Sequence, residues 1–140
     1  MWYDPIISAV LRTPLHRMLG DTMLITVTGL KSGKKYTTPV NYFREGDLLW
    51  IISKRERTWW RNLCGGACVT MLLDGRVAEG FAEAVLDEEI VAARLADYVR
   101  QNPAVAGPLG VRMEQGIANA EDAARLAKDR MCVKIRNAAG

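Results

Sequence analysis

The sequence predicts a small antiparallel β-barrel with peripheral helices, in the α+β or mainly β class. Three observations favour this fold. Short segments rich in β-branched residues follow one another closely between positions 23 and 85. An Asp-Gly dipeptide at 74–75, a strong hairpin signal, separates two of them. A chain of 140 residues suits one domain, here expected to span residues 1–140, and hairpin-linked strands with few helices pack naturally as a barrel.

Residues 1–20 predict an N-terminal helix. Asp4 can cap it, Pro5 fits its first turn, and Pro14 is expected to kink it. The apolar stripe of this helix is expected to cover one side of the barrel. The alternative is a weak contact with a membrane surface, although the polar face is not strongly basic.

The barrel core is expected to span residues 23–85. Pro39 lies inside its second strand and therefore predicts an edge position or a bulge. Residues 29–35 form a basic turn punctuated by glycines, and residues 57–63 predict one or two helical turns. The predicted strands are 23–28, 36–44, 48–53, 67–73 and 76–85.

The chain from 87 to 128 predicts helices. Asp87 can cap a helix that runs to about Asn102, where Pro103 prevents its continuation. A loop is expected over 102–110 and a second helix over 113–128. The alternating residues 131–136 predict a sixth strand that closes the barrel.

Positive charge is concentrated in the first half of the chain. Residues 30–61 contain eight Lys or Arg and three Asp or Glu, whereas the whole chain has a net charge of only +3. Such a field attracts phosphates, carboxylates or a nucleic-acid backbone, and an ordinary solvated surface is the alternative. A nucleic-acid partner is disfavoured because no readout motif is present.

Cysteine usage and hydropathy indicate the cytoplasm as the expected location. The three cysteines are an odd number without a secretion signal, which argues against a disulfide framework. Cys64 and Cys68 have neither a second cysteine pair nor a nearby histidine, so no zinc site is expected. No apolar run approaches the roughly 20 residues that span a bilayer.

Three segments are expected to line one groove: residues 28–35, 37–39 and 53–54. The glycines of the first let backbone N–H groups face an anion, and its lysines add charge. Its spacing is not that of a Walker loop. The groove is expected to hold a phosphate or carboxylate tail at the lysine end and a ring at the Pro39 end.

These segments resemble the deazaflavin-dependent nitroreductase family of flavin and deazaflavin oxidoreductases. The resemblance implies a six-stranded split β-barrel of the FMN-binding type that binds coenzyme F420 and transfers a hydride to a quinone, an enone or a nitro compound. Leu30 and Tyr36 stand where the family commonly has arginines, so FMN is an alternative cofactor. The matching stretches are 14–17, 28–39, 46–47, 53–54, 59–63 and 133–136.

The resemblance and the groove together give a predicted site. Ser53, Tyr36 and Tyr42 are expected to donate hydrogen bonds to the substrate oxygen, with packing as the alternative role for the tyrosines. The cofactor is expected to contact Lys31, Ser32, Lys34, Lys35, Thr37, Thr38, Pro39, Val40, Asn41, Ser53, Lys54, Trp59, Trp60 and Asn62.

Two functional alternatives stay open. The same barrel can hold a deazaflavin, FMN, haem or lipid without turnover, as a carrier, or it can be an FMN-dependent reductase. The sequence is compatible with a homodimer, because a barrel edge and flat aromatic groups can pair with a second copy.

Overall fold

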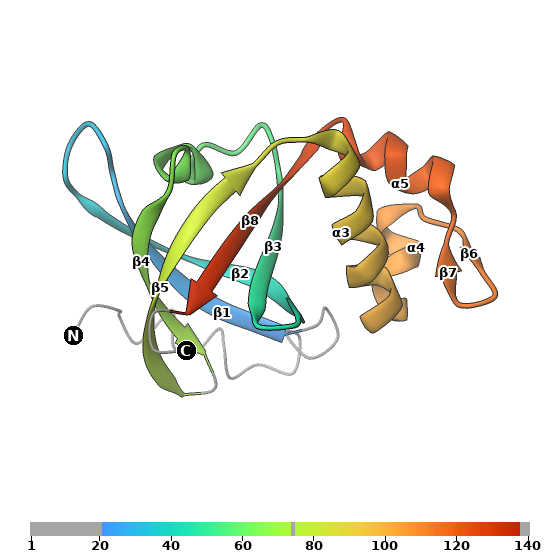
Figure 1. The fold of residues 1–140 in the computed structure, drawn as a ribbon, viewed down its shortest axis with the longest axis horizontal. Coiled ribbons are helices and arrows are strands. Elements are labelled where there is room, and N and C mark those ends of the chain that lie inside the picture. Colours follow the sequence, from blue (N-terminus) through green and yellow to red (C-terminus); the bar gives the residue numbers. More distant parts are fainter. Residues whose placement is uncertain (1–20, 74, 138–140) are drawn as a thin grey trace.

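Six strands form a closed barrel in the computed structural model, which describes residues 21–73 and 75–137 (Figure 1). Their order is β1-β2-β3-β8-β5-β4, and every neighbouring pair is antiparallel. This confirms the six-stranded barrel expected from the sequence. The strands are β1 Asp21–Thr28, β2 Lys35–Glu45, β3 Leu48–Lys54, β4 Ala67–Leu73, β5 Arg76–Val85 and β8 Arg130–Asn137. The predicted N-terminal helix lies outside the described residues.

Alternating apolar residues fill the barrel. In β3, for example, Leu49 and Ile51 point inward, while Trp50 belongs to a second cluster on the outer face. Successive side chains of a strand point to opposite faces, so a single strand contributes residues to both clusters. Gly80 of β5 lies directly against β8. A Cβ there would lie 2.8 Å from the carbonyl oxygen of Arg136 and 2.9 Å from a methyl group of Ile135.

Strand β2 separates from β3 halfway along its length. The two strands pair only from Tyr42 with Ile51 to Glu45 with Leu48. Residues 35–41 of β2 pair with β1 alone, so their other edge has no strand partner among the described residues. Pro39 lies in this half-paired segment, as its missing N–H led us to expect. The closed barrel thus has a split between residues 35–41 of β2 and the end of β3, where these two strands do not pair.

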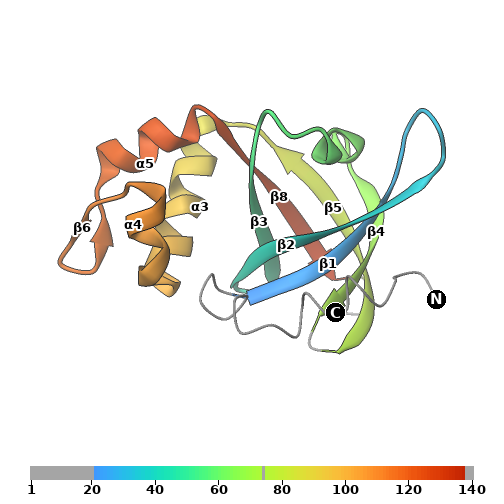
Figure 2. The ribbon, with the colours of Figure 1, turned by 180° about the vertical axis from the view of Figure 1, so that it is seen from behind.

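Helices gather at one side of the barrel, where they cover the outer cluster (Figures 1 and 2). Asp87 accepts hydrogen bonds from two backbone N–H groups and begins α3, as predicted. Phe43, Trp50 and Cys132 from the barrel pack against Leu95 and its neighbours. The elements outside the barrel are η1 Trp59–Leu63, α3 Glu88–Gln101, η2 Pro103–Val105, α4 Ala106–Leu109, β6 Met113–Glu114, β7 Ile117–Ala118 and α5 Ala120–Ala127.

Two predictions for this region are wrong. The expected loop 102–110 contains η2 and α4, because Pro103 fits the first turn of a helix as well as it ends one. The expected helix 113–128 begins only at Ala120. Before it, Gln115 and Gly116 adopt positive φ angles of 54° and 79° and turn the chain between β6 and β7. Asn119 then caps α5 by accepting from the N–H of Asp122.

A buried carboxylate joins this hairpin to α5. Asp122 is 2% exposed and accepts from both the backbone N–H and the side chain of Arg112, each at 2.9 Å. Arg125 adds an ion pair at 3.1 Å. The side-chain hydrogen bond from Arg112, together with the backbone one, lowers the pKa of Asp122 from 3.8 to about 2. These contacts stabilise the packing of the β6–β7 hairpin against α5, in the region where apolar periodicity had predicted one helix over 113–128.

A second charged group fixes α3 against the β2–β3 hairpin. Arg94 of α3 pairs with Glu45 at the end of β2 and with Asp97 one turn on. Its guanidinium lies 5.3 Å from the centre of the Trp50 ring, and the Trp50 indole N–H donates to Glu45. The position of α3 relative to the barrel is therefore set by an ion pair as well as by apolar packing. No helix among the described residues is long and apolar enough to cross a membrane.

Candidate functional site

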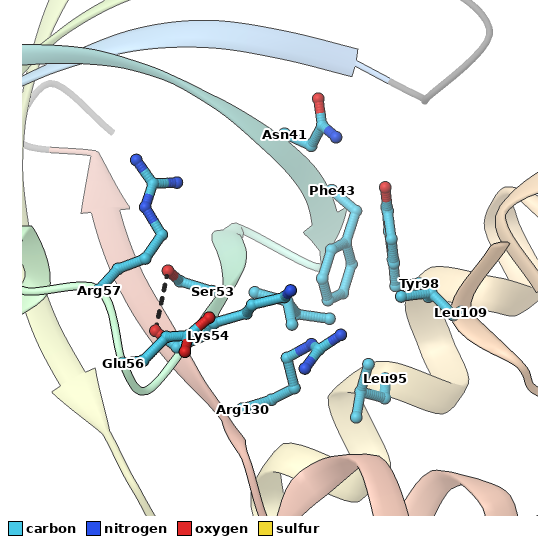
Figure 3. A pocket seen from close by; sticks show the side chains of 11 residues that line it. Asn41, Phe43, Ser53, Lys54, Glu56, Arg57, Leu95, Tyr98, Leu109 and Arg130 are labelled. Carbon is cyan, nitrogen blue, oxygen red and sulfur yellow. Dashed lines mark hydrogen bonds between the residues drawn. The ribbon is translucent and has the colours of Figure 1, made fainter.

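A pocket of about 510 Å³ lies where the barrel meets the helices, next to the end of β3 (Figure 3). Its volume is in the range of roughly 300–1,000 Å³ typical of small-molecule sites. Strands β2, β3 and β8, the loop after β3 and the helices α3 and α4 contribute to it. The lining residues are Asn41, Phe43, Ile52, Ser53, Lys54, Glu56, Arg57, Leu95, Tyr98, Leu109 and Arg130.

One side of the pocket is apolar and aromatic. The rings of Phe43 and Tyr98 lie 5.4 Å apart at 33°, with Leu95 nearby on α3. Burial raises the pKa of the Tyr98 hydroxyl, and a hydrogen bond with the Asn41 side chain partly offsets this rise. Tyr98 therefore stays a protonated hydrogen-bond donor at neutral pH. This side can accept a flat ring and can recognise one polar atom on it.

The other side of the pocket is cationic. Lys54, Arg57 and Arg130 line it, and Glu56 is the one acidic residue among the lining side chains. Arg55 does not line the pocket but shapes the loop, because its guanidinium donates to the carbonyl oxygens of Arg130 and Leu86 at 2.7 and 2.6 Å. The loop after β3 is thereby tied to the beginning of β8.

A hydroxyl at the edge of the pocket is held by the short helix η1. The Ser53 hydroxyl is largely buried and accepts from the indole N–H of Trp59 at 3.3 Å. Its own proton has only a long contact, 3.5 Å, with the carbonyl oxygen of Lys54. Trp60 donates to that same carbonyl and packs into the barrel core. The hydrogen bond from Trp59 thus fixes the position of the Ser53 hydroxyl, while the hydroxyl proton makes only a long hydrogen bond.

The basic turn lies at the other end of this arrangement. Gly29 closes it by donating to the carbonyl oxygen of Lys34 at 2.7 Å, and a Cβ at Gly29 would lie 2.8 Å from the Tyr36 ring. The backbone N–H of Leu30 donates to the Asn62 side chain of η1. Helix η1 therefore connects the turn to Ser53, and it lies between the turn and the end of β3 in both views (Figures 1 and 2).

Three residues of the predicted site line the pocket: Asn41, Ser53 and Lys54. Lys31, Ser32, Lys34, Lys35 and Tyr36 lie exposed in the turn or beside it. The sequence predicted them as the end of the groove that holds an anionic tail, and they do not line the pocket.

The remaining predicted residues lie along the split or in the core. Pro39 is exposed, Thr38 is half-buried, and Thr37 shares a hydrogen bond of 2.8 Å with Thr26. The ring end of the groove was expected beside Pro39, yet the pocket opens beside Asn41. Trp59 and Asn62 link Ser53 to the turn. Three predicted site residues belong to the barrel core: Val40, Tyr42 and Trp60. Strand alternation turns Val40 and Tyr42 inward, and Trp60 packs there from η1.

Sequence reasoning missed most of the pocket wall. Tyr98 stood inside an amphipathic helix and carried no signal of its own. Arg57 was counted only as part of the basic segment, and Arg130 lay just before the predicted strand 131–136. Their shared location follows from the packing of α3 against the barrel and from the pairing of β3 with β8.

Comparison with known proteins agrees with this architecture. A model of the F420H(2)-dependent quinone reductase family matches residues 10–117. No protein of curated function matches the chain significantly.

Solved structures with 12–18% identity share the fold. A conserved hypothetical protein from Mycobacterium tuberculosis has 16% identity and a TM-score of 0.59, over 96% of this chain and 84% of that one. A protein of unknown function from Agrobacterium tumefaciens has 18% identity and a TM-score of 0.58, over 96% of this chain but only 55% of that one. An F420 reductase has 12% identity and a TM-score of 0.51, over 96% and 95% of the two chains.

The family model covers about three quarters of the chain, and the split barrel has the fold of these neighbours. The resemblance read from the turn, the strand ends and η1 is therefore confirmed: the chain belongs to the F420H(2)-dependent quinone reductase family, a family of F420-dependent oxidoreductases.

Proposed function

We propose that this protein uses reduced F420 to reduce a small electron-poor molecule, with a quinone as the first candidate. One observation carries the proposal. The half-paired edge of β2 faces the end of β3, with a lysine-rich turn beyond one end and a pocket with an aromatic wall at the other. An elongated cofactor with its acidic tail at the turn and its flat ring along the split would present that ring to an acceptor in the pocket.

The residues present fit F420 chemically. Lys31, Lys34 and Lys35 supply exposed positive charge for an acidic tail. Gly29 and Ser32 give the turn its compact shape, and Asn62 ties it to η1. Ser53 and Trp59 stand between this turn and the pocket. The cofactor, when bound, supplies the hydride chemistry.

The chain's own contribution is orientation, exclusion of water and stabilisation of charge. Phe43, Leu95 and Leu109 provide an apolar wall, which limits water next to a bound ring. The hydroxyls of Ser53 and Tyr98 can donate to a carbonyl oxygen of the acceptor, where negative charge develops during reduction. Tyr98 takes this role in place of Tyr36 and Tyr42, neither of which lines the pocket.

The experiment is a titration followed by a turnover measurement. Binding of F420 is followed by tryptophan fluorescence, with FMN and haem titrated in parallel. Reduced F420 and a naphthoquinone are then mixed with the protein, and the reappearance of oxidised F420 is followed by its absorbance. We expect F420 to bind more tightly than FMN and to be reoxidised faster than without protein. Tight binding without faster reoxidation would favour a carrier, and absence of F420 binding would refute the proposal.

A further inference from the structure

On the cationic side of the pocket, two like charges lie at directly opposed positions of neighbouring strands. Lys54, the last residue of β3, lies directly opposite Arg130, the first residue of β8, in the antiparallel register. Both side chains extend into the pocket (Figure 3). Like charges at directly opposed positions of a sheet destabilise it. A negative charge between them would reverse this effect.

The protein pairs these cations only weakly. Glu56 is the one acidic residue that lines the pocket, and no ion pair among the described residues involves Lys54 or Glu56. Arg130 is paired only with Asp129, which is 71% exposed, whereas the Arg130 side chain is 13% exposed. A guanidinium has five N–H donors, and the Asp129 contact engages Nη1 alone. Arg130 therefore retains donors for a carboxylate or phosphate.

The acidic ligand on this side is distinct from the tail held by the turn. The turn and the pocket lie on opposite sides of η1, linked through Asn62, Trp59 and Ser53. Lys54, Arg130 and the aromatic wall lie on one side of Ser53, whereas the Arg57 side chain extends on the other side (Figure 3). A ligand here meets two cations at one end and the Phe43–Tyr98 wall at the other.

We infer that the electron acceptor is a flat, largely apolar molecule that carries an acidic group, bound by Lys54 and Arg130. The acidic group is a carboxylate or an equivalent oxyanion, and the ring lies against Phe43 and Tyr98. This assignment rests on the proposed function only in calling the ligand the electron acceptor. The preference for an acid is a property of the pocket and can be measured without any redox step.

The test compares two redox-inert probes of the same shape, 2-naphthoate and 2-naphthamide. Their affinities for the full chain are measured by calorimetry at low salt, with and without saturating F420. We expect the acid to bind about tenfold more tightly than the amide, because hydrogen bonds to a charged partner are stronger. F420 should leave the affinity for the acid within about threefold, since the two ligands occupy different ends of the site.

Variants identify the residues responsible. Arg130→Gln and Lys54→Gln should each reduce the preference for the acid to below about threefold. Arg76→Gln, which removes an exposed charge at the β4–β5 hairpin, is the matched control and should retain the preference. If Arg130→Gln fails to fold, Lys54→Gln still provides the test, because Lys54 is exposed.

Three results would overturn the inference: equal affinity of acid and amide for the unmodified protein, an unchanged preference in both Lys54→Gln and Arg130→Gln, or displacement of the acid by F420. Failure of the proposed function is a separate outcome. In that case reduced F420 is not reoxidised with any acceptor, while the preference for 2-naphthoate and its loss in the variants persist.

Discussion

Removing the hydrogen bond between Ser53 and Trp59 tests directly how η1 positions the site residues. The substitution is Ser53→Ala, which removes an acceptor that is 7% exposed and leaves the Trp59 indole N–H without its partner. A typical net hydrogen bond contributes about 0.5–1.5 kcal/mol, and an unsatisfied buried donor costs about 1–3 kcal/mol. Trp59 is only half-buried, so water can partly replace Ser53. We therefore expect a loss of about 1 kcal/mol.

The assay is urea unfolding followed by far-UV circular dichroism, because tryptophan fluorescence would itself change. For a chain of this length, 1 kcal/mol corresponds to a decrease in Tm of about 3–4 °C. Thr58→Ala is the control: Thr58 makes no side-chain capping hydrogen bond, and its loss should change stability by less than about 0.5 kcal/mol. Trp59→Phe completes a double-mutant cycle with Ser53→Ala, with an expected coupling of about 0.5–1 kcal/mol.

The same variants separate structure from function. Trp59→Phe keeps the Ser53 hydroxyl, whereas Ser53→Ala removes the proton proposed to reach the acceptor. We expect Ser53→Ala to lower kcat/KM by about tenfold or more, and Trp59→Phe to lower it less. Additive stability effects in the cycle would refute the hydrogen bond. An unchanged kcat/KM in Ser53→Ala would refute the role of its hydroxyl.

Three further predictions concern the fold. Gly80→Ala should lower the free energy of unfolding by about 1–3 kcal/mol through overpacking against β8, whereas Gly107→Ala, whose Cβ would meet nothing within 4 Å, should lower it little or not at all. Asp122 has a folded pKa of about 2, below its ordinary value of 3.8, so its stabilisation is complete above about pH 5 and is lost as the pH falls toward 2. Urea unfolding of Asp122→Asn should lack that part of the acid dependence. Burial raises the pKa of Cys132 to about 12, so iodoacetamide should modify the two exposed cysteines of the native protein and reach Cys132 only after unfolding, as mass spectrometry would detect.

The order of the strands along the chain was readable from local chemistry. Asp-Gly at 74–75 predicted the β4–β5 hairpin, Asp87 predicted the start of α3, and Pro39 predicted a strand segment with a free edge. Each of these signals acts through the backbone of a few neighbouring residues, and the structure agrees with each. The prediction of a helix over 113–128 was wrong because Gln115 and Gly116 turn the chain. The helical spacing of the apolar residues concealed this turn.

By itself, the sequence determined which residues form strands, where the basic turn lies and, through the matching motifs, the family. Only the tertiary structure decided what lines the pocket. Tyr98 meets Phe43 because α3 packs on the outer face of the barrel, and Lys54 faces Arg130 because β3 pairs with β8, 76 positions later in the chain. Local signals carry no information about such pairings, because they depend on how distant apolar faces are buried against each other.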